Sequence, residues 1–165
     1  MRTRVVVVGV AGLLVVLAAG ASYAGERNAL AATFPLSGYQ EVPPISTGGS
    51  GTFTGSLVGG TTIEYDLTYS GTEATVTAAH IHFGTPGVNG GIVAFLCGGG
   101  GKPACPLSGT VSGTIVAADV LAVPSQGIVA GDFAALLDAI VAKATYANVH
   151  STAFPNGEIR GKLSN

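Results

Sequence analysis

Apolar and polar side chains alternate most regularly over residues 61–69 of the chain. Ile63, Tyr65, Leu67 and Tyr69 take every second position, and hydroxyl or acidic residues fill the positions between them. Successive side chains of a β-strand leave opposite faces of the sheet. The alternation therefore predicts a strand with one buried face and one solvated face.

Seven further strands are predicted from short apolar segments that are bounded by turn-forming residues. The strand over residues 51–58 is joined to the first by Gly59-Gly60, which is a two-residue hairpin signal. The chain carries 26 glycines and 8 prolines, and their scattered positions suit short strands joined by turns. The other predicted strands cover residues 33–39, 75–82, 91–96, 108–116, 145–150 and 158–163.

One segment, residues 132–142, has a helical rather than an extended pattern. Asp132 precedes the apolar positions and is a suitable N-cap residue. The stripe that recurs with helical spacing consists of Phe133, Leu136, Leu137, Ile140 and Val141. We expect this short helix to cover one open end of the β core.

The predicted fold is all-β: a Greek-key, Ig-like antiparallel β-sandwich, or a flattened Greek-key barrel, with one short helix. About 135 residues in eight strands are enough for one core, and no linker, charge run or low-complexity block divides them. We therefore expect a single domain over residues 30–165.

The first 24 residues are predicted to be a secretory signal peptide. Arg2 and Arg4 precede an uncharged stretch that ends in Ser22-Tyr23-Ala24, with small residues at the −3 and −1 positions of a cleavage site. An N-terminal membrane anchor is the alternative, because about 20 uncharged residues can span a bilayer. Either interpretation places the domain outside the cytoplasm, secreted or extracytoplasmic.

Without Arg2 and Arg4 the chain has five basic residues against nine acidic ones, a net charge of −4 without any basic cluster. This excludes nucleic acid and anionic lipid surfaces as partners, and after cleavage nothing predicts membrane insertion. An extracellular protein or an envelope component is the expected partner.

Two cysteines, Cys97 and Cys105, occur in a chain that is predicted to be exported. An even number of cysteines in an oxidising compartment predicts a disulfide bond. The glycine-rich segment between the two can turn back on itself, and the spacing is not that of a CxxC redox motif. We expect a local structural crosslink.

The three histidines of the chain are the candidate chemistry. His80 and His82 stand two residues apart on a predicted strand and therefore share a face, and His150 ends another predicted strand. If the two strands are neighbours, the three imidazoles converge on one place. Three neutral imidazoles suit one copper or zinc ion and leave a further coordination position open.

The surroundings of the histidines leave three interpretations open: a metal site, a structural polar cluster, and a site for some other ligand. Asn148 and Glu158 are candidate partners of a metal-binding histidine, and Arg160 is a candidate anion-steering cation. In the second interpretation the histidines form a hydrogen-bonded polar cluster, and Glu158 and Arg160 form an ordinary ion pair. No catalytic residues are predicted, because the chain has neither a Gly-x-Ser-x-Gly elbow nor a free cysteine.

Several phrases of the sequence together resemble the CHRD domain, the module named after the developmental regulator chordin. They occur in the same order and span the whole chain after the signal segment. They are Leu36-Ser37-Gly38-Tyr39-Gln40-Glu41-Val42-Pro43-Pro44, Ala79-His80-Ile81-His82, Pro86-Gly87-Val88-Asn89-Gly90, Tyr146-Ala147-Asn148-Val149-His150-Ser151 and Phe154-Pro155-Asn156-Gly157-Glu158-Ile159-Arg160-Gly161.

The resemblance implies an extracellular, Ig-like β-sandwich module and does not imply a reaction, so the function must be argued from the site. The first hypothesis is a non-enzymatic binding or scaffolding module. The alternative is a mononuclear copper or zinc protein with redox activity if the ion is copper. The His-x-His pair is similar to the copper-binding strand of Cu,Zn superoxide dismutases, but three histidines are too few for their dinuclear site.

Overall fold

The computed structural model describes residues 30–164, so the predicted signal peptide lies outside the described residues. Eight strands were predicted, and residues 30–164 contain eight, all paired antiparallel with their neighbours. They are β1 (Thr33–Ser37), β2 (Ser50–Val58), β3 (Thr62–Ser70), β4 (Val76–Phe83), β5 (Gly91–Cys97), β6 (Gly109–Ile115), β7 (Thr145–Ser151) and β8 (Ile159–Lys162).

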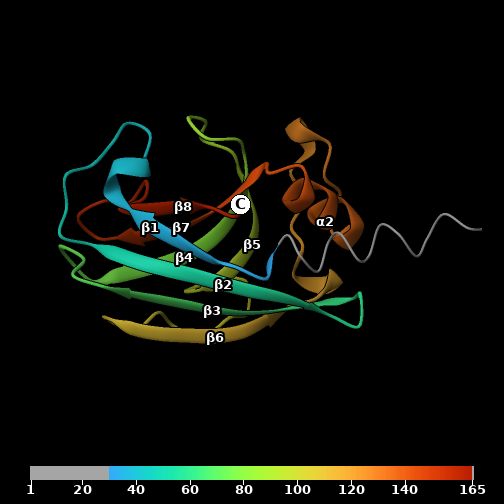
Figure 1. Cartoon of the computed structure of the whole chain (residues 1–165), viewed down its shortest axis with the longest axis horizontal. Coiled ribbons are helices and arrows are strands. Elements are labelled where there is room, and N and C mark those ends of the chain that lie inside the picture. The colour runs from blue at the N-terminus through green and yellow to red at the C-terminus, as the bar shows by residue number, and fades with distance from the viewer. Residues whose placement is uncertain (1–29, 165) are drawn as a thin grey trace, which may run out of the picture.

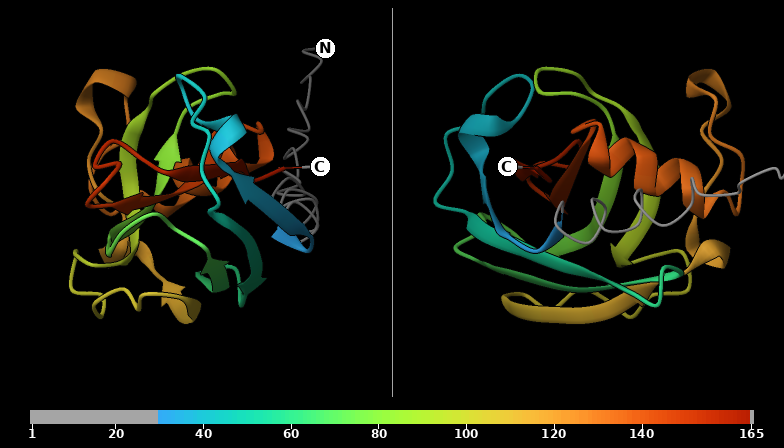
Figure 2. Two further views of the ribbon diagram at one scale, coloured as in Figure 1. Left: turned by 90° about the vertical axis from the view of Figure 1, so that its left-hand side faces the viewer. Right: turned by 45° about the vertical axis from the view of Figure 1, so that its right-hand side comes forward.

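The strands form one continuous sheet in the order β5-β4-β7-β8-β1-β2-β3-β6. Figure 1 shows the sheet curling around its core, and in the right-hand view of Figure 2 it forms a nearly closed ring. The edge strands β5 and β6 lie close to each other where the ring would close. The all-β class is confirmed, and the single curled sheet is closer to the flattened barrel of the prediction than to the two packed sheets of a sandwich.

The alternating strand predicted over residues 61–69 is β3, and its alternation sets which side chains form the core. Ile63 and Leu67 are fully buried inside the ring, while Glu64 and Asp66 lie on the outer, solvated face. The predicted hairpin at Gly59-Gly60 is also confirmed, because both glycines have the positive φ angles that such a turn requires, 62° and 76°.

The hydroxyl groups of two core tyrosines on β3 each bind a carbonyl group across the interior. The Tyr65 hydroxyl donates to the carbonyl oxygen of Leu96 on β5 at 2.7 Å, and the Tyr69 hydroxyl donates to that of Pro106 at 2.7 Å. Each bond pairs a buried polar atom, which would otherwise cost free energy. These bonds connect β3 to the strand and loop on the far side of the core.

The predicted helix is α2 (Phe133–Val141), and the Asp132 side chain caps it by accepting from the backbone N–H of Ala135 at 2.9 Å. Figure 1 shows α2 at one end of the curled sheet, where Leu136, Leu137 and Ile140 join the core. The predicted covering of an open end is therefore confirmed, although Val141 does not belong to the buried stripe. Three short 3-10 helices were not predicted: η1 (Gly38–Gln40), η2 (Ala117–Asp119) and η3 (Pro124–Gln126).

The predicted disulfide bond joins Cys97, at the end of β5, to Cys105 in the connection to β6. Lys102, inside the closed loop, binds Asp119 at 2.9 Å and donates to the carbonyl oxygen of Thr114 at 2.7 Å. The crosslinked loop lies at the place where β5 approaches β6. No helix in the described part of the chain is long and apolar enough to cross a membrane.

Candidate metal centre

The candidate site lies where the sheet is covered on both faces. All seven residues of β7 are buried, as are Ala79 to His82 in the middle of β4. Ala79 and Ile81 belong to the core. Strand alternation therefore turns His80 and His82 to the opposite face, where loops and the rings of Phe95 on β5 and Tyr146 on β7 cover them.

β4 and β7 are direct neighbours, and their register brings the histidines together. Ala78 of β4 pairs with His150, so His80 is only two positions along the strand from the third histidine. The three imidazoles are each at least nine-tenths buried, and one ring nitrogen from each lies within 4.8 Å of the others. The predicted convergence of the three histidines is confirmed.

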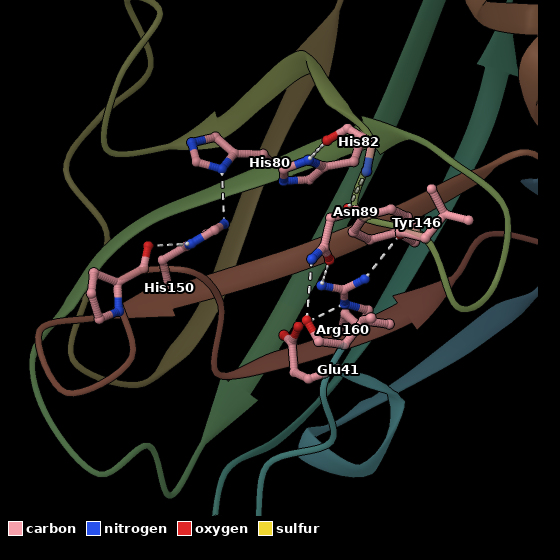
Figure 3. A network of polar contacts seen from close by, with 11 residues as sticks. Glu41, His80, His82, Asn89, Tyr146, His150 and Arg160 are labelled. Atoms are coloured by element: carbon pink, nitrogen blue, oxygen red, sulfur yellow. Dashed lines mark hydrogen bonds and ion pairs between the residues drawn. The ribbon is translucent and has the colours of Figure 1, made fainter.

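His80 and His150 are in direct contact. Nδ1 of His80 lies 3.1 Å from Nε2 of His150, as Figure 3 shows, and the two ring centroids are 4.7 Å apart. The His82 ring lies further away, with its centroid 5.5 Å from that of His80 and 5.9 Å from that of His150. The cluster is thus a close pair with a third ring beside it.

Two backbone carbonyl groups fix which nitrogen of two rings carries the proton. Nδ1 of His82 lies 2.9 Å from the carbonyl oxygen of Gly90, and Nδ1 of His150 lies 3.0 Å from that of Pro155. A carbonyl oxygen only accepts, so both Nδ1 atoms are protonated and both Nε2 atoms carry lone pairs. His80 then donates from Nδ1 to Nε2 of His150.

The lone pair on Nε2 of His82 accepts no hydrogen bond from the described residues. Its Nε2 atom is buried and has no hydrogen-bond partner there. A buried polar atom without a partner is costly, and a protein usually satisfies it with water, an ion or another group. Nε2 of His82 is therefore the atom that most directly indicates a bound species.

Burial keeps all three imidazoles neutral. Desolvation, together with the nearby His150 and His82, lowers the pKa of His80 from 6.5 to about 3. Desolvation lowers the pKa of His82 to about 4, despite its bond to Gly90. Burial also lowers the pKa of His150. Neutral imidazole is the form that binds transition metals. The three rings are already in this form, so they need not be deprotonated from imidazolium before they coordinate an ion.

A stack of three planar groups supports one side of the cluster. The His82 ring lies parallel to the Tyr146 ring, with 4.8 Å between centroids and 4° between planes. The guanidinium carbon of Arg160 lies 4.4 Å from the Tyr146 centroid. A cation over an aromatic ring is a favourable arrangement. The stack fixes the His82 ring in orientation, while Arg160 contacts Tyr146 and not the histidine cluster.

The predicted ion pair between Arg160 and Glu158 does not form. Nε of Arg160 binds a carboxylate oxygen of Glu41 at 2.6 Å, and Nη2 donates to the Asn89 side chain at 2.7 Å. Glu158 turns toward another loop, where it accepts from the Thr47 hydroxyl at 2.6 Å and the Glu73 backbone N–H at 2.7 Å. Arg160 is therefore committed to Glu41, which leaves it poorly placed to steer anions toward the histidines.

Asn148, the remaining predicted neighbour, lies between the histidines and Glu41. It pairs with His80 on one side and with Arg160 on the other in the strand register. Its side chain is buried, and its carbonyl oxygen has no partner among residues 30–164. A β-carbon placed on Gly157 would clash with this side chain and with Glu41, so both groups pack closely against the backbone of Gly157.

Five residues of this network were not predicted as site residues: Glu41, Asn89, Gly90, Tyr146 and Pro155. All five lie inside the phrases that carry the resemblance to the CHRD domain. At Gly90 an added β-carbon would collide with the carbonyl group of Phe83, so the loop that supplies the carbonyl for His82 requires glycine there.

A comparison with known protein families identifies the same domain that these sequence phrases resemble. The family model of the CHRD domain matches residues 32–163, which include all three histidines and the stack beside them. No curated protein and no solved structure matches the chain.

Proposed function

The chain belongs to the CHRD domain family, and on that premise we propose that it is an exported, non-enzymatic module that binds one copper or zinc ion. His80, His82 and His150 supply the ligands. The observation that carries the proposal is the buried, unpartnered Nε2 atom of His82, which lies beside the two other neutral imidazoles.

The spacing of the ring nitrogens supports a single ion. Zinc lies about 2.0–2.1 Å from imidazole nitrogen, which in a tetrahedron puts two ligand nitrogens about 3.3 Å apart. The pair formed by His80 and His150 is already at 3.1 Å. The remaining separations are within 4.8 Å, so a small rotation of the His82 ring would complete the set.

The hydrogen bonds behind the rings also favour a metal. Metal-binding histidines usually donate their second ring N–H to a carbonyl or carboxylate group, which fixes the tautomer and strengthens the ligand. The carbonyl groups of Gly90 and Pro155 do this for His82 and His150. His80 would coordinate through Nδ1 after moving its proton to Nε2, and the ion would replace the hydrogen bond between His80 and His150.

Three imidazoles without a thiolate or carboxylate suit copper and zinc better than magnesium or calcium, which prefer oxygen ligands. A bound ion would act as a Lewis acid at its open position, and copper would also exchange an electron. The export that we predict and the extracellular occurrence typical of CHRD domains support a role in binding outside the cell.

Metal analysis of protein purified without a chelator or a histidine tag tests the proposal. We expect one equivalent of copper or zinc in the wild type and none in the His80→Ala, His82→Ala double variant. The control is Glu64→Gln, Asp66→Asn, which removes two exposed carboxylates at the same i, i+2 spacing on β3; it should keep the ion. Wild-type protein that stays metal-free after incubation with both ions would leave the histidines as a purely structural polar cluster.

A further inference from the structure

We propose that a cavity beside Tyr146 and Arg160 binds a small organic carboxylate. The cavity has a volume of about 200 Å³ and lies between η1, the loop of residues 84–87 and the adjoining ends of β7 and β8. None of its lining residues is a histidine, so this proposal does not depend on the metal.

Two cations and no acidic residue line this cavity. Arg160 and Lys162 stand two residues apart on β8, so their side chains leave the same face of the strand. Lys162 is half-buried and makes no hydrogen bond or ion pair with the residues that the structure describes. The charge of Arg160 is balanced by Glu41, whereas no acidic residue among residues 30–164 forms an ion pair with Lys162. The cavity therefore has an uncompensated positive charge, which favours an anion.

Arg160 has N–H groups to spare for a ligand. A guanidinium group has five N–H donors. One serves Glu41, one the carbonyl oxygen of Val88 and one Asn89. The two that remain belong to Nη1 and Nη2. With the Lys162 ammonium group they form a donor set that matches a carboxylate.

The other walls of the cavity indicate the chemistry of the part of the ligand beyond its carboxylate. Pro86 and the edge of the Tyr146 ring give the cavity an apolar part, while the exposed Thr85 and Gln40 add a hydroxyl and an amide group. Pockets for drug-sized ligands usually measure about 300–1,000 Å³. A cavity of about 200 Å³ fits a smaller molecule. The expected ligand is a carboxylate attached to a compact apolar body.

The cavity walls are formed in advance of binding. Residues 85–88 make a tight turn in which the Val88 N–H donates to the Thr85 carbonyl oxygen at 3.2 Å, and Gly87 takes the φ of 81° that the turn requires. The Tyr146 hydroxyl accepts from the Gly90 N–H at 3.1 Å. A pre-organised wall lowers the ordering cost of binding.

Amide NMR titration of the full exported protein tests this site, with sodium benzoate as the probe and benzamide as its uncharged counterpart. We expect benzoate to shift the amide signals of Gly84, Thr85 and Gly87 in a saturable way and benzamide to leave them in place. Sodium sulfate forms a third arm. Equal shifts with sulfate would reveal a site for anions in general and would overturn the assignment to organic carboxylates.

Three variants complete the test. Lys162→Gln should weaken benzoate binding about tenfold, as expected for one charged hydrogen bond, while Lys162→Arg should keep most of it. Lys102→Gln, which removes the same charge from the disulfide loop, is the control and should bind as the wild type does. The proposal is wrong if benzoate leaves the three amide signals unmoved, or if Lys102→Gln weakens binding as much as Lys162→Gln. Neither result would affect the metal site.

Discussion

At the scale of single residues, the histidines owe their chemistry to burial and to two carbonyl groups. Desolvation holds the pKa of His80 at about 3 and that of His82 at about 4. The carbonyl groups of Gly90 and Pro155 leave Nε2 of His82 and His150 with lone pairs. The spacing of His80 and His82 predicted that they share a face. The sequence pattern could not predict the carbonyl groups, because backbone groups are the same in every residue.

The lowered histidine pKa values predict that the protein, when metal-free, loses stability in acid. An unfolded histidine with a pKa of 6.5 takes up a proton that folded His80, with a pKa of about 3, does not. The stabilising contribution is therefore complete above pH 6.5 and is lost as the pH falls from 6.5 toward 3. At pH 5 the loss of stability relative to neutral pH amounts to about 2 kcal/mol for His80.

Urea unfolding in the presence of a chelator at pH 7.5 and pH 5.0 measures this effect. His80→Asn removes the titrating ring, so its free energy of unfolding should fall about 2 kcal/mol less between the two pH values than that of the wild type. An identical fall in both proteins would contradict the lowered pKa of His80.

At the scale of elements, the pattern of the sequence identified strands and faces but not strand partners. The alternation in β3 set its buried and solvated faces, and Gly59-Gly60 marked the hairpin. β7 is buried along its whole length and does not alternate, since loops cover its outer face. Nothing in the local pattern of β4 and β7 required them to pair. The sequence could therefore predict that the histidines converge only on the condition that these two strands are neighbours.

The capped helix gives a prediction at this scale. The Asp132 side chain satisfies the backbone N–H of Ala135 at the start of α2. Asp132→Ala should lower the free energy of unfolding by about 1 kcal/mol, a typical value for the loss of an N-cap. Thermal or urea unfolding provides the measurement. Asp138→Ala is the matched control, because Asp138 is an exposed aspartate of the same helix whose side chain caps neither helix end within the described part of the chain, and it should change stability little. Equal losses in both variants would contradict the capping role.

At the scale of the whole molecule, the strands form one curled sheet, which is closer to the expected flattened barrel than to the expected sandwich of two packed sheets. The ring of strands encloses the apolar core, α2 covers one end, and the disulfide loop lies where β5 approaches β6. The histidines lie outside this core, under loops that also hold Glu41 and Asn89. Which loops meet over β4 and β7 depends on the long-range strand order. For this reason the pairing of Arg160 with Glu41 was not predicted.

Export of the protein, with removal of its signal peptide, is a further prediction. Cleavage after Ala24 or within a few residues of it follows from the charged start, the uncharged stretch and the small residues at the expected site. Intact-mass measurement on protein from the native host should give a chain that begins near residue 25. A mass that includes residues 1–24 would support the membrane-anchor alternative.

The most direct test of the metal centre is anomalous diffraction from crystals of the wild-type protein soaked separately with zinc and copper at low concentration. With at least one of the two ions, we expect one strong anomalous peak between His80, His82 and His150, about 2.0–2.1 Å from one nitrogen of each ring. Under the same conditions, crystals with no peak at this position, or with peaks only at surface carboxylates such as Glu64 and Asp66, would contradict the account.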